Sequence, residues 1–443
     1  MTGRTISFVT LGCRVNQADT HQMRTGLEAR GLRTVPAECE ADVVVVNTCT
    51  VTARAELSDR QAIRRARRTS PGARVVVTGC WAQTSPQAVA TLGGVDLVVG
   101  NLDKPRLPEL VEELLGRPRG APRVEVGDLA RTRPGPVAPP APPAGRARAF
   151  VKIQDGCQHR CAFCIVPFAR GASRSLPPAV VEAQVRRLVE AGHPEIVLTG
   201  IDLGHYGSDA RPRTSLAALL DRLVGVGGLR WLRLSSMLPA YFTEDVLQIL
   251  TSAPAIAPHF HVPLQSGSDR VLRRMRRPYT TATYRRVVER LAGAIPRLGL
   301  GADVIAGFPG ESEADFAATL EMVRTIPFSY LHVFPYSERP GTAAATLPGR
   351  LEPRTVTARA RQLREAGAAR RRAFHAAMVG RTEDVLVLET RDPDSGELTG
   401  LTGNYVEVRF AGPEHLRCRP ARVRVTGAGE TAVRGVLEDA RAA

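Results

Sequence analysis

AFVKIQDGCQHRCAFC, residues 149–164, carries the strongest signal in this chain. It begins as an apolar, strand-like segment and ends in Cys157, Cys161 and Cys164, with the spacing C-x3-C-x2-C. A four-iron cluster has four iron corners that cysteines normally fill, so three cysteines leave one iron open to a small molecule. Zinc is the competing interpretation, but zinc sites usually add a second cysteine pair or histidines, and no second pair follows. The loop therefore predicts an iron–sulfur cluster, with His159 as a loop residue and not a ligand.

Three more cysteines, Cys13, Cys49 and Cys80, lie far apart, yet each follows an apolar, strand-like run. The predicted strands are ISFVTLGC (6–13), DVVVVNTC (42–49), RVVVTGC (74–80) and LVVG (97–100). Helical stretches at 20–30 and 55–68 lie between them, which predicts an open parallel α/β sheet. Loops beyond the carboxyl ends of such strands gather at one edge, so the three cysteines are expected to converge. Cys39 and Cys418 match no spacing pattern and are predicted to be simple thiols.

A strand–loop–helix rhythm repeats through residues 149–375. The six candidate strands are 149–157, 195–202, 229–237, 259–267, 300–310 and 330–337. Most of them are followed by helix-forming sequence, which predicts a partial (β/α)6 barrel. In such barrels the working residues sit at the C-terminal ends of the strands.

The chain divides into four predicted parts, an α/β domain (1–118), a linker (119–148), the partial barrel (149–375) and a small antiparallel β-barrel (376–443). The linker prediction rests on RTRPGPVAPPAPPAGRAR (131–148), whose proline content favours an extended, semi-rigid chain. The last part has short alternating strands separated by turns such as DPDSGE and TGN. Small barrels of this kind commonly bind nucleic acid. A plain closing domain is the alternative.

The charge balance points to a polyanionic partner. The 443 residues carry a formal net charge of +16, and Lys104 and Lys152 are the only lysines among the 60 basic residues. Biased base composition would explain arginine in place of lysine, but not 60 basic against 44 acidic residues, so RNA is the expected partner. No apolar run approaches the roughly 20 residues that span a bilayer, and no signal peptide precedes the first strand, so we expect a cytoplasmic protein without a membrane partner.

The C-x3-C-x2-C loop, with Phe163 before its last cysteine, resembles that of the radical S-adenosylmethionine superfamily. The resemblance implies that the open iron binds S-adenosylmethionine and that one electron cleaves it to methionine and a 5′-deoxyadenosyl radical. Three later segments are similar to the superfamily's cofactor-binding motifs, LTGID (198–202), LSSM (234–237) and GADVIAGFPGE (301–311). The cofactor-binding residues implied in this way are Phe163, Gly200, Asp202, Ser235, Ser236, Asp303 and Gly307.

The whole chain resembles the methylthiotransferase family of that superfamily, and its C-terminal module resembles the TRAM domain, an RNA-binding barrel. The resemblance implies two four-iron clusters, one on each catalytic cysteine triplet, and two equivalents of S-adenosylmethionine per turnover. The cluster on Cys13, Cys49 and Cys80 would be auxiliary and would hold the sulfur to be donated. Implied partners are the tRNA anticodon loop, an electron donor such as flavodoxin or ferredoxin, and a sulfur source.

Four motifs point to one branch of the family. They are TLGCRVNQAD (10–19), VVNTCTVT (45–52), TGCWAQ (78–83) and IVLTGIDLGHYG (196–207). They most resemble the MtaB-type branch, which acts on N6-threonylcarbamoyladenosine at position 37 of tRNA, and Arg14-Val15-Asn16 favours this branch. The alternatives are isopentenyladenosine in tRNA and an aspartate of a ribosomal protein. A non-catalytic RNA-binding protein is disfavoured, because structural metal sites are usually closed.

Four arginines are candidate RNA-binding residues, Arg170, Arg174, Arg273 and Arg276. The last two lie in PLQSGSDRVLRRMRRPYT (263–280), where Arg274 and Arg277 could also follow an RNA backbone. A solvated barrel helix is the alternative for that stretch. After Arg170 the family commonly shows a basic run that ends in arginine, where this chain has Leu176.

Overall fold

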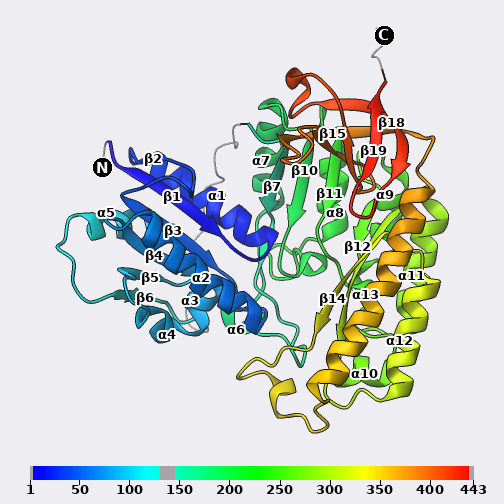
Figure 1. The fold of residues 1–443 in the computed structure, drawn as a ribbon, viewed down its shortest axis with the longest axis horizontal. Coiled ribbons are helices and arrows are strands. Elements are labelled where there is room, and N and C mark those ends of the chain that lie inside the picture. Colours follow the sequence, from blue (N-terminus) through cyan, green and yellow to red (C-terminus); the bar gives the residue numbers. More distant parts are fainter. Residues whose placement is uncertain (1–2, 130–144, 439–443) are drawn as a thin grey trace.

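The computed structural model describes residues 3–129 and 145–438 as three units that pack against one another (Figure 1). An N-terminal α/β unit lies against one side of a central partial barrel, and a small β-barrel closes one end of that partial barrel. Among the described residues no helix is long and apolar enough to cross a membrane.

The N-terminal unit is a six-stranded parallel sheet with the order β2-β1-β3-β4-β5-β6. Its strands are β1 (Thr5–Thr10), β2 (Arg33–Thr34), β3 (Val43–Thr48), β4 (Arg74–Gly79), β5 (Leu97–Val99) and β6 (Arg123–Glu125). Its helices are α1 (Arg14–Glu28), α2 (Ala53–Thr69), α3 (Cys80–Thr84), α4 (Pro86–Ala90) and α5 (Leu107–Leu115). Helices α2, α3 and α4 bury apolar side chains on one face of the sheet, and α1 and α5 do so on the other. The predicted open parallel sheet is confirmed.

Three details of this unit differ from the expectation. Strand β6 extends the sheet into the segment 119–148 that was expected to be linker, and β2 was not expected. Both strands are two or three residues long and lack an apolar run, so no strand pattern marks them. Helix α1 begins directly after Cys13 and not at Thr20, because its first turns bury polar Asn16 and Asp19 and thereby break the apolar periodicity. Most of the predicted proline-rich linker, residues 130–144, lies outside the described residues.

The central unit has six parallel strands, as predicted, wrapped by helices. The strands are β7 (Arg148–Lys152), β10 (Glu195–Thr199), β11 (Trp231–Leu234), β12 (His259–His261), β13 (Gly299–Ala306) and β14 (Tyr330–Pro335). A separate short antiparallel pair is formed by β8 (Gln154–Asp155) and β9 (Arg174–Ser175). The helices are α6 (Val166–Arg170), α7 (Pro178–Glu190), α8 (Leu216–Val224), α9 (Glu244–Ser252), α10 (Asp269–Arg274), α11 (Thr281–Ala294), α12 (Glu313–Thr325) and α13 (Pro353–Ala376). Two three-stranded sheets, β7-β10-β11 and β12-β13-β14, meet through a parallel bridge between Leu232 and Ile256. The barrel is open between β7 and β14.

The C-terminal unit is a closed five-stranded barrel with the order β15-β16-β17-β19-β18. Its strands are β15 (Thr382–Arg391), β16 (Leu398–Thr402), β17 (Glu407–Phe410), β18 (Pro420–Ala428) and β19 (Val433–Leu437). The expected barrel is present, but it is not wholly antiparallel, because β17 and β19 pair in parallel. Strand β16 was not predicted, since LTGLT carries no clear alternation of apolar and polar residues. The loop after β16 plugs the amino-terminal end of the central barrel, where Arg233 donates to the Gly403 carbonyl at 2.9 Å.

Candidate active site

Cys13, Cys49 and Cys80 meet at the carboxyl edge of the N-terminal sheet, directly after the neighbouring strands β1, β3 and β4. Gly12 has φ +95°, and a Cβ there would lie 2.8 Å from Cys49 Cβ and 3.0 Å from its Sγ. Glycine therefore lets the loop that carries Cys13 approach Cys49 closely. Burial raises the pKa of the Cys49 thiol to about 12, and the charges of Cys80 and Cys13 add to the rise. The structure thus brings the three separated thiols together.

The surroundings of this triplet are polar, and the Cys80 charge contributes to raising the pKa of the nearby Arg170 guanidinium. The Cys49 backbone N–H donates to the Asp59 carboxyl group at 3.1 Å, and burial raises the pKa of that carboxyl to about 8. The Asn101 amide nitrogen lies 3.9 Å from Cys80 Sγ. The Asn16 side chain donates to backbone carbonyls of both strand-end loops, Leu11 at 2.7 Å and Thr48 at 2.9 Å, and so holds these loops together.

Cys157, Cys161 and Cys164 lie on one loop after β8. Gly156 begins this loop at φ +74°, where a Cβ would lie 2.0 Å from the Ala172 carbonyl oxygen, so only glycine fits. The loop is pinned by backbone hydrogen bonds from Cys157 N–H to the Gly171 carbonyl and from Ala162 N–H to the Met275 carbonyl, both 2.9 Å. Burial raises the pKa of the Cys157 thiol to about 12, and nearby Asp202 and the other two cysteines add to that rise.

The side chain of Arg277 places a positive charge beside this second triplet. The Arg277 guanidinium donates to Cys161 Sγ at 3.3 Å and lies 5.5 Å from the centroid of the Phe163 ring. Arg277 is therefore a neighbour of the thiols, and a role along an RNA backbone stays a prediction. The sequence did not mark this contact, because Arg277 lies 116 positions from Cys161 along the chain and only the fold brings the two together.

The two triplets lie on opposite sides of the contact between the N-terminal unit and the central barrel, which we call the seam. Burial raises the pKa of the Cys164 thiol to about 11, and the charges of Cys161 and, across the seam, Cys80 contribute to the rise. Helix α3, which begins with Cys80, packs against α6, which follows Cys164 closely. The Asn101 side chain donates across the seam to the Ala169 carbonyl at 2.7 Å.

A buried charge network joins the two units beside this seam. Asp19 of α1 contacts Lys104 Nζ at 2.8 Å, Arg170 Nη2 at 3.1 Å and Lys152 Nζ. Arg170 also donates to Asp155 at 3.0 Å, and its side chain is only 1% exposed. The prediction that Arg170 binds RNA is therefore wrong, because its guanidinium is fully engaged between the units.

Comparisons with known proteins agree with this architecture. A model described as "Uncharacterized protein family UPF0004" matches residues 5–100, and one described as "Radical SAM superfamily" matches residues 151–323. The threonylcarbamoyladenosine tRNA methylthiotransferase MtaB of Aquifex aeolicus is 41% identical over 92% of this chain and 97% of its own length. The tRNA-2-methylthio-N(6)-dimethylallyladenosine synthase of Moorella thermoacetica is 35% identical over 98% of this chain and 99% of its own length. This chain belongs to the radical S-adenosylmethionine methylthiotransferase family.

A solved structure shares the fold of this methylthiotransferase. The radical S-adenosylmethionine methyltransferase TsrM of Kitasatospora setae superposes with a TM-score of 0.57 over 78% of this chain and 74% of its own, at 19% identity. Family membership implies iron–sulfur chemistry with S-adenosylmethionine. The donor sets fit that chemistry, because each site gathers thiols alone, and thiolates are the usual ligands of iron–sulfur clusters.

Asp202 lies at the centre of a polar cluster beside the Cys157 loop of the methylthiotransferase. Its backbone N–H donates to Gln154 Oε1 at 2.9 Å, and its carboxyl group lies 3.8 Å from Cys157 Sγ and 3.3 Å from His159 Nε2. Burial raises the pKa of Asp202, and His159 and His205 oppose the rise. The Tyr241 hydroxyl lies 2.5 Å from His159 Nε2. Gln154 and Tyr241 had no motif to mark them in the sequence.

The other residues expected to bind the cofactor lie in different surroundings. Gly200 packs against Gln154, and Ser235 is buried with no hydrogen-bond partner for its Oγ among the described residues, whereas Ser236 is exposed. A Cβ on Gly307 would lie 2.5 Å from Val356 of α13, so this glycine serves the approach of a helix. The role of these residues in binding S-adenosylmethionine stays a prediction.

The remaining predicted arginines differ in their exposure to solvent and in their hydrogen bonds. Arg273 and Arg276 are exposed at the end of α10 and can reach a partner. Arg174 is only partly exposed and donates to the carbonyls of Arg170 and Ala172. Arg274 donates to the carbonyls of Pro309 and Pro348, so it supports a loop and does not extend into solvent.

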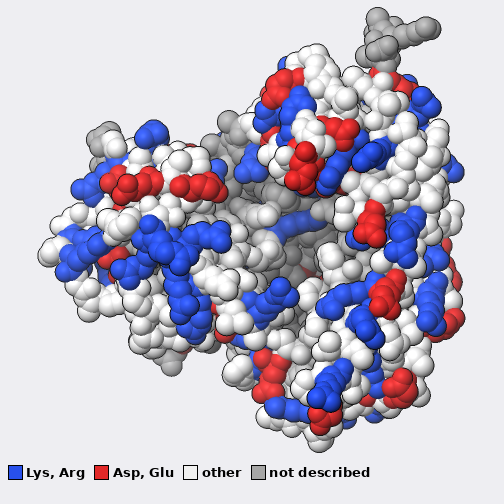
Figure 2. All heavy atoms as spheres, viewed as in Figure 1, with Lys and Arg blue, Asp and Glu red and all other residues white. Residues whose placement is uncertain are grey.

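The inner wall of the barrel is polar, because residues that alternate with the apolar, helix-facing ones point inward. Asp303 lies between two imidazoles, with His261 Nε2 at 3.1 Å and His332 Nδ1 at 3.2 Å from the same carboxylate oxygen. These three residues offer ligand atoms within 4.8 Å of one another, a spacing that could hold a metal ion. Figure 2 shows a hollow between the N-terminal unit and the barrel, with Lys or Arg atoms on its floor. His332 (56% exposed) and Phe334 (39% exposed) lie on β14 at the open edge of the barrel.

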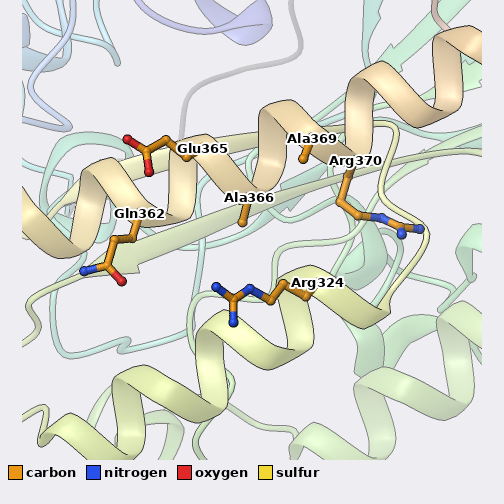
Figure 3. A pocket seen from close by; sticks show the side chains of 6 residues that line it. All are labelled: Arg324, Gln362, Glu365, Ala366, Ala369 and Arg370. Carbon is orange, nitrogen blue, oxygen red and sulfur yellow. The ribbon is translucent and has the colours of Figure 1, made fainter.

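A separate surface hollow lies between α12 and α13 (Figure 3). It has a volume of about 440 Å³ and is lined by Arg324, Gln362, Glu365, Ala366, Ala369 and Arg370. No cysteine of either triplet lines it, and its charged side chains are the ordinary polar faces of two packed helices. It is therefore not part of the active site.

Proposed function

We propose that this methylthiotransferase installs a methylthio group at C2 of N6-threonylcarbamoyladenosine at position 37 of tRNA. Each cysteine triplet holds one four-iron cluster, and two equivalents of S-adenosylmethionine are consumed for each group transferred. The observation that supports the proposal is the approach of the two cysteine triplets to each other where α3 packs against α6. Relatives named for this modified nucleoside support the substrate.

The two sites divide the chemistry. With both clusters bound, the site at Cys157, Cys161 and Cys164 supplies the electron that cleaves S-adenosylmethionine, and the site at Cys13, Cys49 and Cys80 supplies the sulfur. A radical route is required, because the C2–H bond of adenine is neither acidic nor electrophilic enough for acid–base chemistry. The protein's contribution is to hold both sites next to each other, where the N-terminal unit packs against the barrel.

Named side chains perform that positioning. The Arg277 hydrogen bond to Cys161 Sγ orients the thiol loop, and the Asp202–Gln154 pair lines the wall next to Cys157. The buried and unpartnered Ser235 hydroxyl at the end of β11 is available to a polar group of the bound nucleoside cofactor. The Asp19 network keeps the N-terminal unit from moving away from the barrel.

The tRNA must bring an unstacked base into the hollow, since position 37 lies in a loop whose bases can be extruded. The exposed Arg273 and Arg276 and the net charge of +16 suit a phosphate backbone. Figure 2 shows a dense group of Lys and Arg side chains on the face of the N-terminal unit beside the hollow. The C-terminal barrel, an electron donor such as flavodoxin or ferredoxin, and a sulfur source complete the proposed assembly.

Dimethylallyladenosine in tRNA is the second candidate substrate. The relatives named for it reach 37% identity, which overlaps the range of those named for threonylcarbamoyladenosine, at 35% to 41%. Overall identity therefore does not separate the two nucleosides.

Mass spectrometry of tRNA nucleosides tests the proposal in cells that lack the gene, with and without its restoration. We expect 2-methylthio-N6-threonylcarbamoyladenosine to disappear and return. Loss of the 2-methylthio-dimethylallyl nucleoside instead would contradict the substrate and leave the reaction intact. If neither nucleoside changes, tRNA methylthiolation itself is contradicted, and an aspartate of a ribosomal protein becomes the substrate to examine.

A further inference from the structure

Three arginines from two units surround one tyrosine of the third unit, at the closed end of the central barrel. Arg14, Arg148 and Arg233 have their guanidinium carbons 5.3, 6.0 and 5.1 Å from the centroid of the Tyr405 ring. Arg14 Nη2 also donates to the Tyr405 hydroxyl at 2.6 Å. Arg14 begins α1 in the N-terminal unit, so its side chain leaves its own unit to reach this point.

The tyrosine is held in a conformation that bulky residues rarely adopt. Tyr405 has φ +71°, in the left-handed region, which is costly for a large side chain. Its ring stacks on His259 with centroids 4.4 Å apart, and its backbone N–H donates to the Thr402 carbonyl at 3.0 Å. The packing therefore fixes Tyr405 against its backbone preference, and with it the position of the Arg14 guanidinium.

The positive charge of this cluster is not balanced by the protein. Glu195 is the one carboxylate that pairs with it among the described residues, and Arg233 takes both of its oxygens at 2.8 and 3.1 Å. Arg148 Nη1 lies 3.8 Å from Glu195, and this atom has no hydrogen-bond partner among the described residues, although the Arg148 side chain also interacts with the Tyr405 hydroxyl. Arg14 has no carboxylate within ion-pair distance in the described parts of the chain. Half-buried guanidinium groups without an anion are unfavourable unless a ligand completes them.

The position of Arg14 links this charge to the reaction. Arg14 directly follows Cys13 in the chain, so the Arg14 guanidinium, which has no carboxylate partner, is only one side-chain length away from the backbone that carries a thiol of the auxiliary site. In adenine, N6 and C2 flank N1 on one edge of the ring, so a pocket that holds C2 near that site must also enclose the N6 substituent. A threonylcarbamoyl substituent ends in a carboxylate, whereas a dimethylallyl substituent is apolar and would leave the guanidinium groups unpaired.

We propose that Arg14 and Arg148 bind the carboxylate of the threonylcarbamoyl group and thereby select this nucleoside, with Tyr405 as the positioning residue for Arg14. The inference rests on the proposed function and adds the part of the substrate that is recognised. Arginine suits this role, because its planar fork matches a carboxylate with two parallel hydrogen bonds. No redox or group-transfer step is involved.

The test compares two anticodon stem–loop RNAs with the cluster-loaded enzyme, one with the threonylcarbamoyl carboxylate and one with that carboxylate converted to a primary amide. For the wild type we expect kcat/KM to be about 10- to 100-fold lower for the amide RNA than for the acid RNA, because hydrogen bonds to a charged group contribute that much to binding. Arg14→Gln and Arg148→Gln should lose a similar factor on the acid and discriminate little between the two RNAs. Arg14→Lys should recover part of the preference, because it retains the charge without the fork.

The matched control is Arg186→Gln, which removes an exposed arginine of α7 that lies outside this cluster. It should retain the full preference for the acid. Iron content is measured in every variant to report whether the fold and the Cys13 site survive, and Arg186→Gln should also retain the S-adenosylmethionine cleavage of the wild type without RNA. Fluorescence anisotropy without reductant should show the same acid-to-amide ratio in binding as in turnover.

Two results would overturn the inference and leave the proposed function standing. One is a wild type that modifies acid and amide equally well. The other is Arg14→Gln weakening both RNAs by the same factor, the signature of a contact to a backbone phosphate. A wild type that modifies neither RNA but modifies a dimethylallyladenosine stem–loop would contradict both the proposed function and this inference.

Discussion

The two cysteine triplets are built in opposite ways. Cys157, Cys161 and Cys164 share one loop that is pinned by its own backbone hydrogen bonds and by Arg277. The thiols of the other triplet come from the ends of three strands and meet because the sheet places those strands side by side. The first site therefore depends on a local loop conformation, and the second depends on the correct order of a whole sheet.

Their electrostatic surroundings differ as well. A guanidinium donates to a thiol of the loop triplet, whereas a buried carboxyl group, Asp59, accepts from the backbone beside Cys49. Hydrogen bonds and nearby charge tune the reduction potential of an iron–sulfur site. Under the proposed function, these differences would give the clusters at the two triplets different electronic tasks.

The largest expected effect comes from the loop triplet. Cys161→Ala should reduce both S-adenosylmethionine cleavage and methylthio transfer below detection, because both depend on the electron delivered at that site. Product analysis by mass spectrometry after reconstitution measures both. Cys39→Ala is the control, since Cys39 is an exposed thiol outside both triplets and should retain both activities. Cleavage that persists in Cys161→Ala would contradict the assignment of the loop.

The second effect concerns the charge network that holds the triplets face to face. Asp19→Asn leaves Lys104 and Arg170 buried without their shared anion and should lower the free energy of unfolding by about 3–5 kcal/mol. Denaturant titration measures the change. Glu182→Gln removes surface ion pairs only and should leave the midpoint unchanged. Equal stability of Asp19→Asn and the wild type would show that the seam does not depend on this carboxylate.

The same network predicts the sign of a pH effect. Burial would raise the pKa of Asp19, but Lys104, Lys152 and Arg170 outweigh it and hold this pKa well below its usual value. A carboxyl with a depressed folded-state pKa stabilises the fold above its unfolded-state pKa, and the contribution is lost as the pH falls through the folded-state value. The stability difference between wild type and Asp19→Asn should therefore be full at neutral pH and shrink below about pH 4. A difference that grows toward acid would contradict the account.

The smallest effect distinguishes the two electrostatic environments. Arg277→Met removes a positive charge and a hydrogen bond from Cys161 and should shift the potential of that cluster to more negative values. The cluster at the strand triplet should keep its potential. Redox titration followed by electron paramagnetic resonance measures both, with Arg274→Met, which contacts carbonyls and no thiol, as the matched control. Equal shifts in both clusters would remove the electrostatic distinction.

The sequence predicts the features that depend on local pattern and on strand order. Apolar runs mark the six barrel strands, and the C-x3-C-x2-C spacing marks the loop triplet. The strand triplet follows from the rule that the carboxyl ends of parallel strands meet at one edge. No local pattern marks partners that the fold brings from far away. In the sequence, Arg277 and Arg170 are both candidates for RNA contact. In the structure, each donates a hydrogen bond to a residue more than a hundred positions away.

The most direct test of the central claim, a division of labour between two sites, is one measurement on Cys49→Ala with reductant, S-adenosylmethionine and substrate tRNA. Both 5′-deoxyadenosine and the methylthio nucleoside are quantified in the same reaction. We predict continued release of 5′-deoxyadenosine with no methylthio product, because the loop triplet remains complete while the strand triplet has lost a buried thiol. Methylthio product at the wild-type level would contradict the role of the strand triplet as the source of the sulfur.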